Sequence, residues 1–309
     1  MREEKVIGLR AKIKSSDNVK TKCFFVFEGE KTEPLYFSAL NSMKDYVGIS
    51  SLTELINIER LPGEENWSNP QKILELLEID LSGKITYNKL FNAMIDTLYM
   101  DSYLKKNNEL IKEFSELLSK FIKNTLHKNG NDTVDDLQKT IGLTLGYFKE
   151  KWPDICGIIM ENIETSLGEM EIVYDSDIDT ICLVVDRDPQ SFKSFQFDNV
   201  MEICKRHHYN FLITNPCFEF WLLLHFDAVN AIDKTEMHEN KKVSSKCRFL
   251  EKELKRLLDG YHKNDYDAQK LVQNIQTAIK NEKNFCESLP DLKTQLGSNI
   301  GAFLESIIK

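Results

Sequence analysis

The chain has 309 residues, of which 41% are hydrophobic, and its formal net charge is −9. This length suits one large domain or two smaller ones, with enough apolar residues for a packed core. The negative charge excludes a protein that coats nucleic acid through a basic surface, because such binding needs lysine and arginine to replace counterions. It does not exclude an enzyme that acts on nucleic acid, because carboxylates that hold a divalent metal ion attract phosphate locally.

The apolar segments are short. No run approaches the roughly 18 residues that a membrane span needs, and the N-terminal MREEKVIGLRAKIK carries charges where a secretion signal needs an apolar centre. We therefore expect a soluble, cytoplasmic protein with no membrane partner. The seven cysteines form no CxxC pair, and several lie inside apolar runs, which favours reduced, buried thiols over disulfides or zinc sites.

The first eighty residues alternate between strand and helix patterns. An apolar strand is predicted over residues 22–27 and a helix over 33–44, with Pro34 tolerated in the first turn. A second strand is predicted around 54–61, followed by a helix that starts near Pro70. This order predicts an α/β fold with a parallel sheet flanked by helices.

The pattern then becomes entirely helical. Residues 87–171 show helical periodicities and no convincing strand before Thr180. We interpret residues 82–175 as a helical insertion subdomain that interrupts a discontinuous domain formed by 1–81 and 176–309.

The alternation resumes after the insertion. A nearly all-apolar strand is predicted over 180–185, typical of a strand buried on both faces, and another over 209–214. A helix over 195–207 separates the two strands, and a dense apolar helix over 217–226 follows them. Three amphipathic helical segments are predicted in the remainder, near residues 243–259, 267–285 and 299–308.

Two of the apolar strands end in acidic residues. Glu28 follows the first strand, and Asp186 and Asp188 follow the strand over 180–185. Ligands of open α/β sheets bind beyond the carboxyl ends of the strands, so we expect these three carboxylates to converge there. Their oxygens are ligands suited to Mg²⁺ or Mn²⁺. A structural role stays open, because helix N-termini favour acids and Asp188 with Pro189 can form a turn or cap.

Three sequence blocks, VFEGEKTEPLYFSAL, LVVDRD and TNPCFEFWLLLHF, resemble in this order the signature blocks of the RloB family, to which the abortive-infection protein AbiLii also belongs. The later stretch GYHKNDYDAQKLVQNIQTAIKNEKNF resembles the family's C-terminal region more loosely. Together these resemblances cover residues 20–80 and 178–309 and leave the helical middle unmatched. They imply a Toprim-like fold, in which a glutamate after the first strand and a D-x-D after a later strand hold divalent metal. The matching positions are Glu28, Asp186 and Asp188, and the helical insertion accounts for a separation longer than a compact Toprim core needs.

The resemblance implies a catalytic site for phosphodiester cleavage. Glu28, Asp186 and Asp188 would hold Mg²⁺ or Mn²⁺, with Glu28 serving alternatively as the general base. Glu219 is a further catalytic candidate, because the matching family block also has glutamate there. Its place inside an apolar run means that it must be paired, hydrogen-bonded, bound to metal or at a surface edge. Asn215 is expected to shape the turn that delivers Glu219.

Other polar residues have two interpretations each. In one interpretation, Glu30 and Glu33 contact the metal ligands rather than the metal ion. In the other, the charge of Glu33 stabilises the start of the following helix. Lys31 and Lys263 contact substrate phosphate, or Lys31 only balances neighbouring acids and Lys263 is an exposed loop lysine. His225 is interpreted as a core histidine rather than a catalyst.

Two other motifs do not support a function. Residues 78–90 imitate a calcium-binding EF-hand loop, but Lys89 stands where a bidentate glutamate should close the site. The basic stretch over 241–256 includes Glu251 and Glu253, which favours a solvated helix face over a nucleic-acid contact.

The resemblance therefore implies a Mg²⁺-dependent nuclease effector of a bacterial anti-phage abortive-infection system, acting on DNA or on RNA such as tRNA. It also implies a companion ATPase of the ABC/AAA type. We expect residues 82–175 to be a docking place for that partner or for a second copy in a homodimer. The alternatives are a non-catalytic Toprim scaffold that binds the ATPase or nucleic acid, and a metal-dependent phosphotransfer reaction on a nucleotide.

Overall fold

The computed structural model describes residues 20–58, 70–102, 104–169, 174–245 and 247–308. These residues belong to two compact units. The first, which we call the sheet unit, contains the described residues up to 58, residues 70–74 and those from 175 onward. The second, the helical unit, contains the described residues between 75 and 174.

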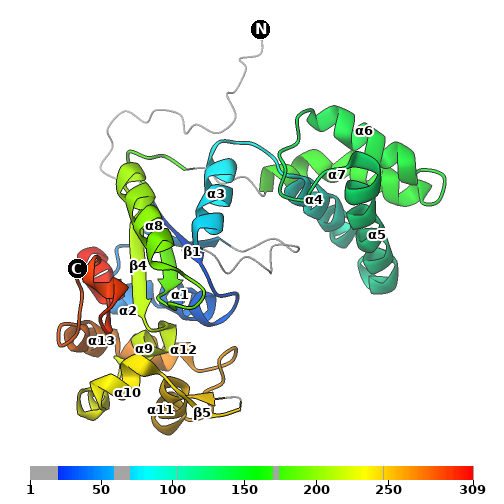
Figure 1. Ribbon diagram of the computed structural model, residues 1–309. Coiled ribbons are helices and arrows are strands. Elements are labelled where there is room, and N and C mark those ends of the chain that lie inside the picture. Colours follow the sequence, from blue (N-terminus) through cyan, green and yellow to red (C-terminus); the bar gives the residue numbers. More distant parts are fainter. Residues whose placement is uncertain (1–19, 59–69, 103, 170–173, 246, 309) are drawn as a thin grey trace. The chain divides into compact units, whose positions relative to one another are not determined.

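The sheet unit is built on five strands in the order β2-β1-β3-β4-β7 (Figure 1). The β1–β2, β1–β3 and β3–β4 pairs are parallel, whereas β4 and β7 are antiparallel. The predicted α/β class with a mostly parallel sheet is therefore confirmed. The strands are β1 (Thr21–Phe27), β2 (Thr53–Ile58), β3 (Thr180–Asp186), β4 (Asn210–Asn215) and β7 (Gly297–Ser298).

The central strands are buried on both faces, as their continuous apolar sequences predict. In the register, Phe27 of β1 is level with Val184 of β3, which is level with Leu212 of β4. These three residues belong to one core with α1, α9 and the C-terminal helices. On the other face, Phe197 of α8 packs on Phe211 of β4 with a centroid distance of 5.4 Å. Helices thus cover the sheet on both sides.

The helices of the sheet unit agree in place with most of the predicted segments. Residues 59–61, at the end of the second predicted strand, lie outside the described residues. The helices are α1 (Thr32–Ser42), α2 (Lys44–Val47), α3 (Pro70–Leu81, which runs into the helical unit), α8 (Ser194–His207), α9 (Phe218–Leu223), α10 (Lys234–Glu239), α11 (Phe249–Leu257), α12 (Ala268–Gln273), α13 (Ile275–Glu282) and α14 (Ile300–Ile307), with 3₁₀ turns at Asp227–Ala231 and Asp291–Lys293.

The helical unit has its own apolar core. Thr86, Asn107 and Asp136 each cap the helix that follows by accepting a backbone N–H bond, which fixes where α4, α5 and α6 begin. Because α3 ends at Leu81 and α4 begins at Tyr87, no twelve-residue loop of the EF-hand type exists there. The helices are α4 (Tyr87–Met100), α5 (Asn108–Phe121), α6 (Leu137–Phe148) and α7 (Pro153–Glu169), with a 3₁₀ turn at Leu104–Lys106 and a π turn at Ile122–Leu126.

The C-terminal region differs from the prediction in one place. The segment predicted as a helix from residue 243 begins with a hairpin of β5 (Lys242–Ser244) and β6 (Cys247–Arg248), and α11 starts only at Phe249. Asn240 explains the change, because its left-handed backbone ends α10 and its side chain accepts the Leu250 N–H at 3.0 Å. None of the described helices has both the length and the apolarity needed to cross a bilayer.

Candidate active site

Glu28 and Asp186 lie together at the carboxyl edge of the sheet. The Glu28 N–H donates to the Val184 carbonyl at 3.1 Å, which extends the β1–β3 ladder one residue beyond β1. The Asp186 N–H then donates to Oε2 of Glu28 at 3.1 Å. The adjacent parallel strands thus bring two of the predicted carboxylates into one site, although they are distant in the chain.

The next strand delivers the third acid. β4 ends at Asn215, whose Nδ2 donates to the Leu292 carbonyl at 2.8 Å, and the chain turns through a cis peptide bond to Pro216 into α9. The Phe218 N–H at the start of α9 donates to Oδ1 of Asp186 at 2.8 Å. Asp186 is therefore bonded to both neighbouring segments, and Glu219 sits in the first turn of the same helix.

Glu219 is buried and paired with a lysine. Its side chain is 6% exposed, and its Oε1 lies 3.2 Å from Nζ of Lys263. The Lys263 carbonyl accepts a bond from the Thr32 hydroxyl at 2.7 Å, and the Tyr266 hydroxyl donates to the Thr32 carbonyl at 2.7 Å. These bonds attach the loop of Lys263 to the start of α1, so its position is fixed from both sides.

Glu33 is the fourth acid of the site and is also buried, in the first turn of α1. Gly29 lies so close to the Glu33 carboxylate that a Cβ at position 29 would overlap it. The glycine after Glu28 therefore leaves room for the Glu33 side chain to fold back over the end of β1. Glu28, Glu33, Asp186 and Glu219 are called the acidic cluster below.

The acidic cluster shifts the pKa of its members in opposite directions. Burial raises the pKa of Asp186 well above its usual value, and the charges of Glu33, Glu219 and Glu28 raise it further. Burial acts on Glu219 in the same direction, but the charge of Lys263 and the hydrogen bonds to the carboxylate hold its pKa below the usual value. A carboxyl with a raised pKa beside one with a lowered pKa is an arrangement typical of acid–base chemistry.

Cys217 lies next to this cluster as the residue before α9. Burial raises the pKa of its thiol well above the usual value, and the charges of Glu219 and Asp186 raise it further. The thiol is therefore protonated at neutral pH, unlike the low-pKa thiols of reactive cysteines.

The carboxylate of Asp188 is bonded within its own loop. Its Oδ1 accepts the Gln190 N–H at 2.9 Å and its Oδ2 accepts the Ser191 hydroxyl at 3.2 Å. These bonds form the turn that the sequence left as the alternative to a metal ligand. Between the two aspartates, Arg187 is buried, and its Nη1 donates to the Phe192 carbonyl at 2.6 Å.

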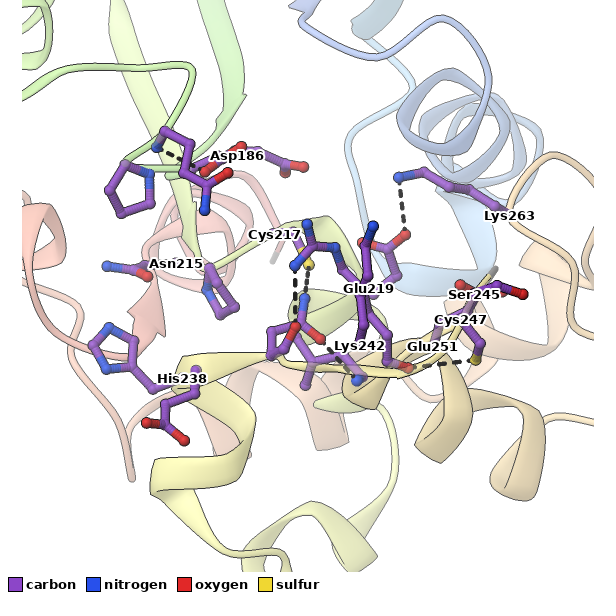
Figure 2. A pocket seen from close by; sticks show the side chains of 18 residues that line it. Asp186, Asn215, Cys217, Glu219, His238, Lys242, Ser245, Cys247, Glu251 and Lys263 are labelled. Carbon is purple, nitrogen blue, oxygen red and sulfur yellow. Dashed lines mark hydrogen bonds and ion pairs between the residues drawn. The ribbon is translucent and has the colours of Figure 1, made fainter.

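A pocket of about 740 Å³ opens beside these groups (Figure 2). Figure 2 shows the Glu219–Lys263 ion pair on one side of it and Asp186 on another. Glu30 and Lys31 are exposed and do not line the pocket, so the structure does not bring these two candidates to it. The predicted site residues that line it are Asp186, Asp188, Asn215, Glu219 and Lys263.

His225 is a buried residue of the core. Its Nε2 lies 2.9 Å from the Tyr36 hydroxyl, and its Nδ1 lies 3.1 Å from the Trp221 carbonyl. Burial lowers its pKa to about 4, so the ring is neutral at physiological pH. The interpretation of His225 as a core histidine is confirmed.

The chain is similar to a known protein family. A family model described as RloB-like protein matches residues 23–307. This range includes Glu28 and Asp186 and spans the helical unit, which the sequence resemblance left unmatched. The chain belongs to the RloB-like family. No curated protein and no solved structure matched it.

The donor chemistry of this RloB-like site fits a divalent cation, because the acidic cluster supplies carboxylate oxygens from three chain segments. The ligand set is not already assembled. Among the residues that the structure describes, no group of three or more His, Cys, Asp and Glu side chains is arranged to hold a metal ion. A metal would therefore require side chains to move, with Glu219 leaving Lys263 and Asp188 leaving its turn.

Several groups of the site were not found from the sequence. The RloB-like chain lines the pocket also with the β5–β6 hairpin, which was predicted as a helix, and with His238. The two strands of the hairpin have three and two residues, with Val243 as their one large apolar side chain, so they are too short to show an apolar alternation in the sequence. One feature of the sequence indicates the burial of Glu33. It is the glycine between Glu28 and Glu30, which leaves room for the Glu33 carboxylate.

Proposed function

We propose that this RloB-like protein is a Mg²⁺-dependent nuclease that cleaves phosphodiester bonds in nucleic acid. The observation that carries the proposal is the acidic cluster, which joins three chain segments distant in the sequence at the carboxyl edge of a parallel sheet. Clusters that raise one pKa and lower another are typical of functional sites.

The residues have distinct roles in this proposal. Glu28 and Asp186 hold the metal ion, with Glu28 alternatively acting as the base that removes a proton from water. A bound divalent ion supplies charge neutralisation at the scissile phosphate and activation of water. Lys263, whose pKa the charge of Glu219 raises, is a cation at neutral pH and contacts a phosphate oxygen once it leaves Glu219.

We further propose that the nuclease is a Toprim-type effector of an anti-phage abortive-infection system and acts with a companion ABC/AAA-type ATPase. The family membership supports this role. The helical unit is the proposed docking place, and exposed large apolar side chains on it support an interaction surface there: Tyr99, Met100, Leu143, Tyr147 and Met160.

The test is a cleavage assay with purified protein on tRNA, single-stranded RNA, single-stranded DNA and duplex DNA, with Mg²⁺ or with EDTA. We expect cleavage with Mg²⁺ only, and a loss of at least about 10²-fold in Asp186→Asn, because that change removes a charged ligand. Asp177→Asn is the matched control, since Asp177 is exposed in the turn before β3 and outside the pocket. Equal rates in the two variants would remove Asp186 from the mechanism.

A non-catalytic scaffold is the second candidate, and one observation favours it. The Glu219–Lys263 ion pair already neutralises one acid of the cluster, as a purely structural site would. Expression in cells with and without the companion ATPase separates the two candidates. A nuclease is toxic when unrestrained and Asp186→Ala abolishes the toxicity, whereas a scaffold behaves the same with either residue.

A further inference from the structure

The pocket beside the acidic cluster has a second wall, which the proposed catalytic roles do not use. The β5–β6 hairpin and the segment before it supply this wall, including Lys242, Cys247 and Arg248. In Figure 2, Lys242 lies on the opposite side of the pocket from Asp186. The pocket therefore joins an acidic side to a side formed by a short polar hairpin.

The hairpin side has a net positive charge. Its two acids already have lysine partners, since Glu239 lies 2.7 Å from Lys241 and Glu251 lies 2.6 Å from Lys255. Lys242 and Arg248 are exposed, and within the described residues neither is paired with a carboxylate. The Arg248 side chain makes one bond, from Nη1 to the Asn240 carbonyl at 3.2 Å, which leaves its other N–H groups available.

The composition of the pocket indicates what these cations bind. The lining contains no phenylalanine, tyrosine or tryptophan, and its one aromatic ring is the imidazole of His238. Most hydrogen bonds between proteins and nucleic acids go to phosphate and sugar, and lysine and arginine are among the main donors, so phosphate is the group that these cations are expected to bind. The volume of about 740 Å³ is that of a small-molecule site, which admits a nucleotide unit of an unpaired strand but not a duplex.

We propose that Lys242 and Arg248 form a phosphate-binding rim that holds a single-stranded nucleic acid by two phosphates near the scissile one, one for each cation. This inference rests on the proposed nuclease function, whose substrate class it narrows to unpaired strands bound without preference for sequence. Binding at the rim needs no metal ion. The rim and the acidic cluster are therefore separable by experiment.

The test measures fluorescence anisotropy of labelled twelve-nucleotide RNA, the same DNA strand and the blunt DNA duplex, in EDTA so that no strand is cut. The variant Lys242→Ala/Arg248→Ala is compared with Lys270→Ala/Lys280→Ala, which removes two exposed lysines outside the pocket. The two double variants carry the same change in charge. Any difference in affinity between them therefore results from the position of the removed cations and not from their number.

We expect the rim variant to bind single strands at least about tenfold more weakly than the control variant. Its plot of log affinity against log salt should be shallower by about 1.4, since each phosphate contact on a single strand contributes about 0.7. Lys242→Ala alone should lower the slope by about half as much. No described interaction of the hairpin depends on the Lys242 side chain, so we expect this single variant to stay folded, which its circular dichroism spectrum checks.

The outcomes separate this inference from the proposed function. Equal affinity and slope in the two double variants would overturn the rim, even if the protein cleaves nucleic acid. Tighter binding of the duplex than of single strands, or no binding of any of the three probes, would overturn it as well. If binding depends on the rim but the wild-type protein cleaves no nucleic acid, the phosphate-binding rim is supported and the proposed nuclease function is contradicted.

Discussion

Nζ of Lys263 lies 3.2 Å from Oε1 of Glu219, and this ion pair joins a C-terminal loop to the first turn of α9. It is the charge that allows Glu219 to stay ionised beside the other acids of the cluster. The ion pair therefore affects the stability of the fold. It also determines that Glu219 is ionised when a cation enters the pocket.

Removing the lysine should leave Glu219 buried without its partner. We expect Lys263→Met to lower the free energy of unfolding by about 1–2 kcal/mol at pH 7.5, less than for a fully buried pair because the Lys263 side chain is 60% exposed. Urea denaturation gives the value. Glu219→Gln in the same chain should recover most of the loss, and a double variant as unstable as the single one would contradict the ion pair.

Asp186 should show a trade-off between stability and function. Its raised pKa means that the folded protein pays for the Asp186 charge, so Asp186→Asn should keep or raise the free energy of unfolding, by about 1 kcal/mol, while it abolishes cleavage. Asparagine retains an oxygen that accepts the Phe218 N–H. Thermal and urea unfolding of the metal-free variant measure this, and a marked destabilisation would indicate a structural role instead.

Arg187 should be needed for the loop that carries Asp188. Its guanidinium is buried and donates to the carbonyls of Phe192 and Lys293 and to the Ser194 hydroxyl. Lysine cannot reproduce this fork of donors, so Arg187→Lys should cost about 2–3 kcal/mol in the free energy of unfolding. Hydrogen exchange should also become faster at residues 188–194, and unchanged exchange there would show that the loop orders itself.

Glu282 should make stability depend on pH. Burial raises its pKa from 4.5 to about 7, although its oxygens accept the N–H groups of Gly301 and Ala302 at 2.9 and 2.8 Å. Because the folded pKa is higher than the unfolded one, the folded state binds more protons between these values. Stability from this group is present below pH 4.5 and is lost as pH rises through 7, by at most about 3 kcal/mol.

Glu282→Gln removes this titration, and denaturation at several pH values between 4.5 and 7.5 measures the effect. The difference in unfolding free energy between wild type and variant should change across that window. Glu305→Gln is the control, because Glu305 is exposed in an ion pair with Lys283. Parallel pH profiles for wild type and Glu282→Gln would contradict the raised pKa.

The sheet and the order of its elements could be predicted because continuous apolar runs of this length are typical of parallel strands that are buried on both faces. Glu28 and Asp186 were found by the same logic, since parallel strands end at one edge. Lys263 as the partner of Glu219 could be named only as a candidate, because their contact depends on a loop held by Thr32 and Tyr266.

Two features could not be predicted for physical reasons. The strands β5 and β6 have only three and two residues, so their sequence is too short to show strand alternation and carries helix-like charge spacing. The turn of Asp188 depends on hydrogen bonds to Gln190 and Ser191, which compete with metal binding for the same oxygens. Sequence spacing alone does not decide that competition.

The most direct test of the central claim is a crystal structure of the protein soaked in Mn²⁺, read through the anomalous signal of the metal. The proposal predicts a peak at the carboxyl edge of the sheet, within about 2.0–2.2 Å of oxygens from both Glu28 and Asp186. A saturated soak that leaves this place without a peak, with Lys263 still on Glu219, would contradict a metal-dependent site.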